Sequence, residues 1–112
     1  MINPGELNKR IIFQKKIEDE GPFQSLDDYE DYVKVWSKVT YLRGRNLYAA
    51  RAANIKTDAE FLIRRRKDLD EKMRIKFTEN GTDRYFGIEG IVPYEKDRMF
   101  LTVTAHEVKY DM

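Results

Sequence analysis

The sequence contains no cysteine and a single histidine, His106. Disulfides, thiolate metal sites and cysteine nucleophiles are therefore excluded. One imidazole cannot hold a zinc ion without further ligands. Because His106 has no companion ligand and lies near the end of an expected strand, we expect it to be structural.

Long apolar runs are also missing. No stretch approaches the roughly 18 apolar residues that a membrane-spanning helix needs. The first residues carry neither the basic nor the apolar region of a secretory signal peptide. We therefore expect no membrane association, and we expect the chain to be made in a cytoplasm.

The common catalytic and nucleotide-binding motifs are absent. The sequence has no P-loop, no G-x-G-x-x-G fingerprint and no G-x-S-x-G nucleophile elbow. The adjacent carboxylates Asp27 and Asp28 lie in a highly charged segment, where solvation keeps them from acid–base work. We expect no catalytic residue, no cofactor and no metal site, and hence no enzyme.

Charge is plentiful but nearly balanced, with a formal net charge of +1. Its distribution is uneven. The segment Glu18–Asp31 holds seven acidic residues and no Lys or Arg, whereas Arg43–Lys76 holds eleven basic and five acidic residues. Opposite charges at two places on one chain either form two solvated faces or pair between copies of the chain.

Short alternating apolar stretches at regular spacing predict a mainly β protein, one domain over residues 1–112. The Asn80-Gly81 pair is a strong signal for a type I′ hairpin turn. Gly87 and Gly90 suggest bulges or barrel corners within a strand. Strands of this spacing are typical of a sandwich or a small barrel. The second strand is apolar on both faces, with Trp36 and Leu42 opposite its valines, which favours a closed six-stranded β-barrel with another element packed outside it. The expected strands cover 7–17, 32–42, 56–67, 73–78, 83–92 and 99–106.

The stretch Trp36–Ile55 predicts the end of the second strand, a turn at Gly44, and one short α-helix before the third strand. Asn46 is the expected N-cap, and Leu47–Ala53 has high helix propensity. Two turns of helix are not stable alone in water, so we expect the helix to dock on the barrel or on a neighbour. The expected subunit or partner contacts include the helix residues Leu47, Tyr48 and Arg51.

The segment 18–31 predicts a long acidic loop between strands one and two, because Gly21 and Pro22 break regular structure. A loop of this length is typically functional or mobile. We expect the segment to order when a partner covers its apolar residues. The residues concerned are Phe23, Leu26, Asp27, Asp28, Tyr29, Glu30 and Asp31.

Four segments in order resemble the head–tail joining proteins of long-tailed phages, the small adaptor or head-closure (stopper) proteins, including those encoded by prophages. They match the family's G-x-L-x-x-R-I-x-x-Q opening, its V-W-A-x-V-x-x-L-x-G-x-E pattern, an I-R-Y-R-x-D-I segment and an F-x-I-x-x-I segment. Asn46 or Leu47 stands where the family often has Glu. The matching segments are Gly5–Gln14, Val35–Ala50, Ile63–Ile75 and Arg84–Ile91.

This resemblance implies a structural virion protein at the head–tail connector, made in the bacterial host. It implies a ring of subunits, expected to be dodecameric in the particle, with the portal or adaptor above and a tail protein below. In some relatives the ring plugs the DNA channel, with passive contact to packaged DNA. The resemblance implies that the acidic loop 18–31 reorders on assembly or faces this channel. We expect a monomer in solution, because no long apolar stripe remains for a permanent interface.

Two alternatives stay open. The first is a small nucleic-acid-binding barrel of the OB type, in which the strand tip Arg64, Arg65 and Arg66 would contact the phosphate backbone. The near-zero net charge argues against it. The same three arginines are otherwise expected to contact other subunits. The second alternative is a tail-completion protein, which shares the size and the β content.

Overall fold

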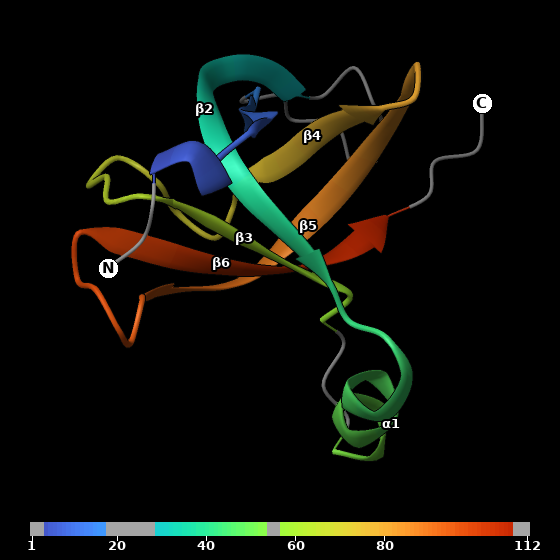
Figure 1. Ribbon diagram of the computed structural model, residues 1–112. Coiled ribbons are helices and arrows are strands. Elements are labelled where there is room, and N and C mark those ends of the chain that lie inside the picture. The colour runs from blue at the N-terminus through green and yellow to red at the C-terminus, as the bar shows by residue number, and fades with distance from the viewer. Residues whose placement is uncertain (1–3, 18–28, 54–56, 109–112) are drawn as a thin grey trace.

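The computed structural model describes residues 4–17, 29–53 and 57–108. Within them, six antiparallel strands close into a barrel in the order β1-β2-β3-β6-β5-β4 (Figure 1). This confirms the predicted six-stranded β-barrel. The elements are η1 (Pro4–Glu6), β1 (Lys9–Lys16), β2 (Tyr29–Tyr41), α1 (Gly44–Ala52), β3 (Ala59–Arg64), β4 (Arg74–Glu79), β5 (Thr82–Pro93) and β6 (Phe100–Val108).

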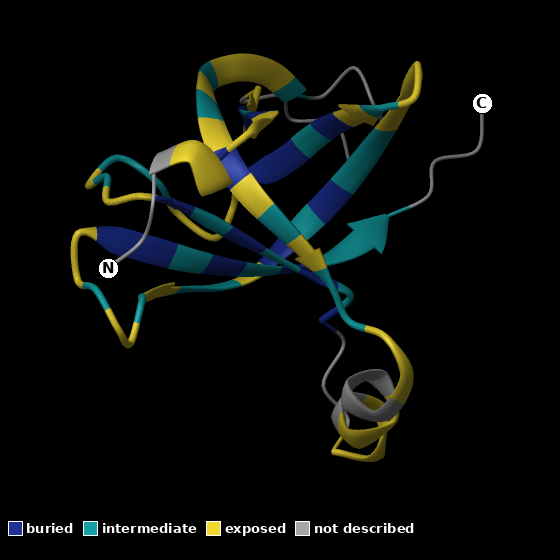
Figure 2. Ribbon diagram, viewed as in Figure 1, coloured by how far each residue is buried: buried dark blue, intermediate teal, exposed yellow. Residues whose placement is uncertain are grey.

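The barrel interior is filled by the apolar parity of each strand, because alternate side chains of a strand point to opposite faces. Ile11 and Phe13 of β1 are completely buried. The rings of Phe61 (β3) and Phe86 (β5) meet edge to face, with centroids 5.1 Å apart. Figure 2 shows buried residues concentrated in the barrel strands and exposed residues on α1 and the connecting turns. Side chains from all six strands therefore contribute to the core.

The hairpin between β4 and β5 is the turn that the Asn80-Gly81 pair predicts. Both residues have positive φ, 53° for Asn80 and 80° for Gly81. A type I′ turn needs positive φ at both central positions, and these two residue types tolerate it best. The predicted bulge is also present, since the pairing of β5 with β6 shifts register between Ile88 and Gly90.

The second strand begins earlier than the sequence predicts. β2 starts at Tyr29, so Tyr29, Glu30 and Asp31 belong to the sheet and not to a loop. They pair with Lys16, Lys15 and Gln14 of β1. The acidic run hides this start, because Glu30 and Asp31 are both exposed and polar although they lie on opposite faces of the strand, so the apolar–polar alternation is lost.

Helix α1 lies between β2 and β3 and begins at Gly44, which has a φ of 55°. Its N-cap is Arg43, with no side-chain capping hydrogen bond, so Asn46 is not the N-cap. The structure ends α1 at Ala52, one residue before the end of the stretch with high helix propensity. α1 projects away from the barrel, and the helix does not cover the outer side of β2 (Figure 1). The outward-facing Trp36 is 51% exposed.

Candidate interaction surfaces

The first candidate surface is the projecting helix α1 (Gly44–Ala52), which we call the arm. Tyr48 on α1 is 81% exposed, so its ring is accessible to a partner. Arg51 instead reaches back to its own chain: it donates to the Thr57 carbonyl over 3.3 Å and forms a close ion pair with Asp58. Leu47 lies in the helix, but its side chain is outside what the structure describes.

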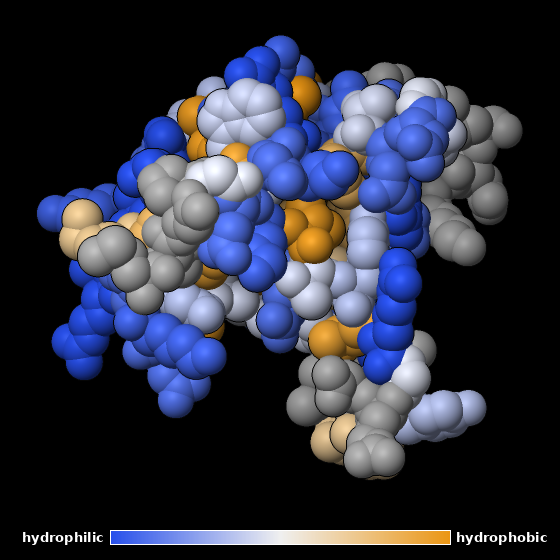
Figure 3. Space-filling model, viewed as in Figure 1, coloured by the Kyte–Doolittle hydropathy of each residue, from blue (hydrophilic) through white to orange (hydrophobic). Residues whose placement is uncertain are grey.

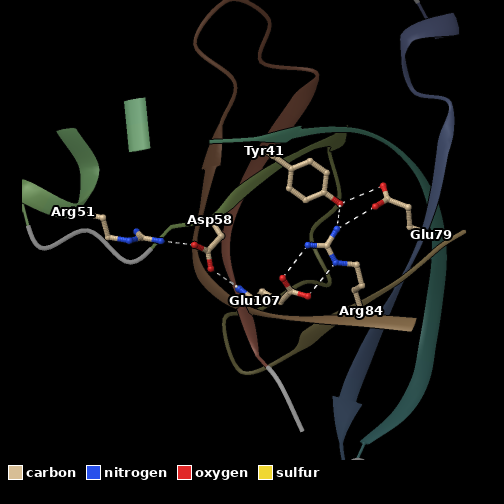
Figure 4. Close-up of polar contacts among 6 residues, drawn as sticks. All are labelled: Tyr41, Arg51, Asp58, Glu79, Arg84 and Glu107. Atoms are coloured by element: carbon tan, nitrogen blue, oxygen red, sulfur yellow. Dashed lines mark hydrogen bonds and ion pairs between the residues drawn. The ribbon is translucent and has the colours of Figure 1, made fainter. Parts of the chain in front are cut away.

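A polar cluster at the barrel end beside α1 was not anticipated from the sequence (Figure 4). Arg84 of β5 donates to both carboxylate oxygens of Glu107 on β6, over 2.8 and 3.0 Å. It also donates to Glu79 of β4 over 3.1 Å and to the Tyr41 hydroxyl of β2 over 2.9 Å. One guanidinium therefore links four strands.

The electrostatics of this cluster follow from those contacts. Hydrogen bonds to Glu107 raise the pKa of Arg84 above its usual range, and burial raises the pKa of the Tyr41 hydroxyl. The adjacent opening of about 710 Å³ is lined by two cations and three carboxylates. Such a site does not attract phosphate, so we interpret it as a structural clamp.

The same clamp connects to the arm through Asp58. One oxygen of the Asp58 carboxylate pairs with Arg51, and the other accepts a hydrogen bond from the Glu107 backbone N–H over 2.8 Å. Asp58 therefore lies between the arm and the barrel end (Figure 4). No local pattern signals these contacts, because the partners of Arg84 lie up to 43 residues away in the sequence.

The second candidate surface is a groove beside Trp36, of about 810 Å³. It brings together the start of the chain, the middle of β2 and the predicted basic tip after β3. The guanidinium of Arg10 stacks over the Trp36 ring at 4.5 Å from its centroid. Figure 3 shows small apolar patches between charged side chains on the viewed face. The groove is lined by Gly5, Leu7, Asn8, Val35, Trp36, Arg64, Arg65 and Arg66.

The three arginines at this tip have different environments. Arg66 donates two hydrogen bonds to Asp68, over 2.8 and 3.0 Å, and Tyr32 donates a third over 2.8 Å. Arg64 and Arg65 are exposed, and neither has an ion pair within the described part of the chain. Arg64 lies 5.9 Å from the Phe100 ring centroid. Two of the three predicted contact arginines are therefore available to a partner.

The expected acidic loop divides between described and undescribed residues. Phe23, Leu26, Asp27 and Asp28 lie outside the described residues. Tyr29 and Asp31 have structural contacts, which corrects the expectation that they belong to the loop. The Tyr29 ring stacks on the buried Arg74 guanidinium at 4.0 Å, and Asp31 accepts from Gln14 over 2.7 Å, while Arg74 donates to Gln14 over 2.6 Å. Only Glu30 of this strand start is exposed without a described polar contact.

His106 lies on the barrel surface. Its Nδ1 is 2.5 Å from the Glu89 carboxylate, and its ring lies against Gly87, the residue it faces across β5 and β6. Among the described residues, no group of His, Asp and Glu side chains has the arrangement of a metal site. None of the described helices has the length and apolar character to cross a membrane.

The closed barrel and the helix α1 define a small, mainly β protein. Its two candidate interaction surfaces are α1 and the groove beside Trp36. A family model for the phage head completion protein matches residues 2–108. The chain belongs to the phage head completion protein family. This assignment confirms the resemblance to phage head–tail joining proteins that the sequence motifs indicate.

A solved structure supports the same fold. The solution structure of a protein from Shigella flexneri 2a matches this chain with a TM-score of 0.66 and 25% sequence identity. The match covers 95% of this chain and 96% of the Shigella flexneri protein. Among curated proteins, no sequence matches this chain.

Proposed function

We propose that this chain is a non-catalytic subunit of the phage head–tail connector. It forms a ring beneath the portal or adaptor, joins the DNA-filled head to the tail, and closes the DNA channel in that ring. The observation that carries the proposal is the family match over residues 2–108, nearly the whole chain. The description of that family favours head completion over the tail-completion alternative.

The projecting arm supports a role in assembly. A two-turn helix that stands off its own barrel exposes Tyr48 to a neighbouring subunit or to a partner in the particle. Large aromatic side chains that await a partner are frequent anchors of protein interfaces. The Arg51–Asp58 pair fixes the base of the arm, so that Tyr48 is presented at a defined place. We expect the arm to make the subunit or partner contact.

The test is electron microscopy of particles from a host in which the gene for this chain is deleted, with and without its restoration. The proposal expects DNA-leaking heads beside unattached tails in the deletion, and normal joined particles on restoration. Restoration with Tyr48→Ala should give an intermediate defect, whereas Glu95→Gln, at an exposed turn, should restore fully. Normal particles in the deletion strain would contradict the proposal.

A further inference from the structure

The groove beside Trp36 has an apolar floor and a basic wall. The apolar lining comes from Leu7 and Trp36, together with Val35, which also packs on the barrel core, and the basic lining from the arginines that follow Ile63. Leu7 is buried against Phe100, so this side of the floor is fixed. Trp36 is half exposed and carries Arg10 on its ring. A ligand that fits this surface combines an apolar side chain with carboxylates.

The charges around the groove strengthen this requirement. Arg10, Arg64 and Arg65 form no ion pair within the described residues. Glu6 is the acid beside the groove lining, and it faces Lys38 at 3.9 Å. Asp68 is engaged by Arg66 and Tyr32. The groove therefore keeps a local excess of positive charge on a chain whose total charge is only +1.

The chain itself contains a segment of the complementary composition. Between β1 and β2, residues 18–28 carry five acids and no Lys or Arg, with two large apolar residues among them. An acidic segment with an aromatic side chain suits a cationic groove with a tryptophan floor, because charge complementarity orients the segment and apolar burial holds it. The apolar residues are Phe23 and Leu26, and the acids are Glu18, Asp19, Glu20, Asp27 and Asp28.

The positions of these two features favour contact between copies over contact within one chain. Lys16 and Tyr29 pair across β1 and β2, so the segment leaves and re-enters the barrel at one place. Trp36 lies about 23 Å further along β2 at ~3.3 Å per residue. A segment held at Lys16 and Tyr29 reaches at most about 22 Å, half the extended length of the thirteen steps between them at ~3.4 Å each. Asp27 and Asp28 lie within two residues of Tyr29, about 7 Å along the chain, so these two acids do not reach the groove of their own chain.

We infer that the groove beside Trp36 binds the acidic segment Glu18–Asp28 of a second copy of this chain, with Phe23 on Trp36 and the acids on Arg64 and Arg65. The inference rests on the proposed ring and names the contact that builds it. Donor segment and acceptor groove lie at different places on the molecule, so the contact is head-to-tail. Contacts of this kind close into a ring when the rotation between neighbours allows.

Trp36 is the single tryptophan of the sequence and reports on its own groove. The experiment adds a synthetic peptide of residues 18–28 to the full chain and follows Trp36 emission. The inference expects a blue shift that saturates and that weakens with added salt. Arg64→Glu with Arg65→Glu should weaken peptide binding roughly tenfold or more, because like charges then face each other. The control Lys72→Glu with Lys96→Glu changes exposed lysines outside the groove and should bind as the wild type does.

The remaining outcomes separate the alternatives. A peptide with Phe23→Ala should bind at least several-fold more weakly, and equal binding would overturn the assignment of Phe23 to Trp36. An Asp27→Lys, Asp28→Lys variant of the full chain at dilute, monomeric concentration should keep the wild-type emission. A shift there would reveal contact within one chain and would overturn the contact between copies. Binding of oligo-dT but not of the peptide would assign the groove to nucleic acid instead.

The failure of this inference can be told apart from failure of the proposed function. If the groove variants bind no peptide but still join heads to tails as the wild type does, this contact does not build the ring and the connector role stands. If the peptide binds but the deletion strain makes normal particles, the contact stands and the connector role is wrong. Two charge-reversed variants give a positive test. A chain with Arg64→Glu and Arg65→Glu should associate with a chain that carries Asp27→Arg and Asp28→Arg. Neither variant should associate with copies of itself.

Discussion

Asp68, beside the groove, accepts three hydrogen bonds from two side chains. Arg66 donates two hydrogen bonds to its carboxylate and Tyr32 donates one. The Arg66 hydrogen bonds, followed by that of Tyr32, hold the pKa of Asp68 well below its ordinary value of 3.8. The same contacts raise the pKa values of Arg66 and Tyr32. Asp68 therefore holds Arg66 in the groove wall, in contrast to the exposed Arg64 and Arg65.

This contact gives the first prediction, a pH dependence. Because the pKa of Asp68 is lower in the folded chain than in the unfolded chain, its stabilisation is complete at neutral pH. It decreases as the pH falls below about 4 toward the lowered folded value. The difference in unfolding free energy between wild type and Asp68→Asn should be largest near pH 7 and should shrink below pH 4. Denaturant unfolding at several pH values measures it.

The control for this prediction is Glu95→Gln at an exposed turn. It should leave the unfolding free energy close to that of the wild type at every pH, because a solvated carboxylate has no partner to lose. A constant difference between wild type and Asp68→Asn from pH 2.5 to 7 would show that the carboxylate charge is not what Asp68 contributes.

At the scale of elements, the Arg84 clamp closes the barrel end beside α1. Its partners come from β2, β4 and β6, so one side chain joins strands that are not all neighbours in the sheet. Replacing Arg84 by Met leaves Glu79 and Glu107 facing each other in a partly buried place. We expect the unfolding free energy to fall by about 2 kcal/mol.

The matched control is Lys38→Met, which removes a cation whose nearest carboxylate, Glu6, is 3.9 Å away on the surface. Surface pairs of this kind contribute about 0–1 kcal/mol, so the control should change stability little. Chemical denaturation of both variants compares them. Equal stability of Arg84→Met and the wild type would mean that the clamp does not hold the barrel end.

Helix α1 gives the second prediction at this scale. Arg51 ties the arm to Thr57 and Asp58, and the pair with Asp58 is half exposed. Arg51→Ala should therefore speed amide hydrogen exchange in Gly44–Ala52 while exchange in the strands stays unchanged. Tyr48→Ala keeps the tie and should leave exchange in the arm near the wild-type rate. Faster exchange throughout the barrel would show that Arg51 supports the whole fold and not the arm.

For the whole molecule, the sequence predicts well what local patterns determine. Alternation locates the six strands, although not the start of β2, since each strand must place an apolar face in one core. The Asn80-Gly81 turn and the bulge at Gly90 follow from backbone requirements that few residue types meet. The basic residues after β3 and the aromatic Tyr48 can also be singled out from the sequence, because charge and aromatic character follow from residue type alone.

The remaining features depend on contacts between distant residues, which no local pattern reveals. Tyr29 starts a strand because its ring stacks on Arg74, far along the chain. The Arg84 clamp needs partners on three other strands. The stacking of Arg10 on Trp36, which lies 26 residues further along the chain, is likewise a contact that no local pattern predicts.

The central claim is that this chain is a subunit of the head–tail connector, and cryo-electron microscopy of intact particles at the head–tail junction tests it most directly. We expect a ring at that junction, around the DNA channel, into which the six-stranded barrel fits with α1 contacting a neighbouring subunit or an adjacent protein. A junction whose density is fully explained by other proteins, with no place for this barrel, would contradict it.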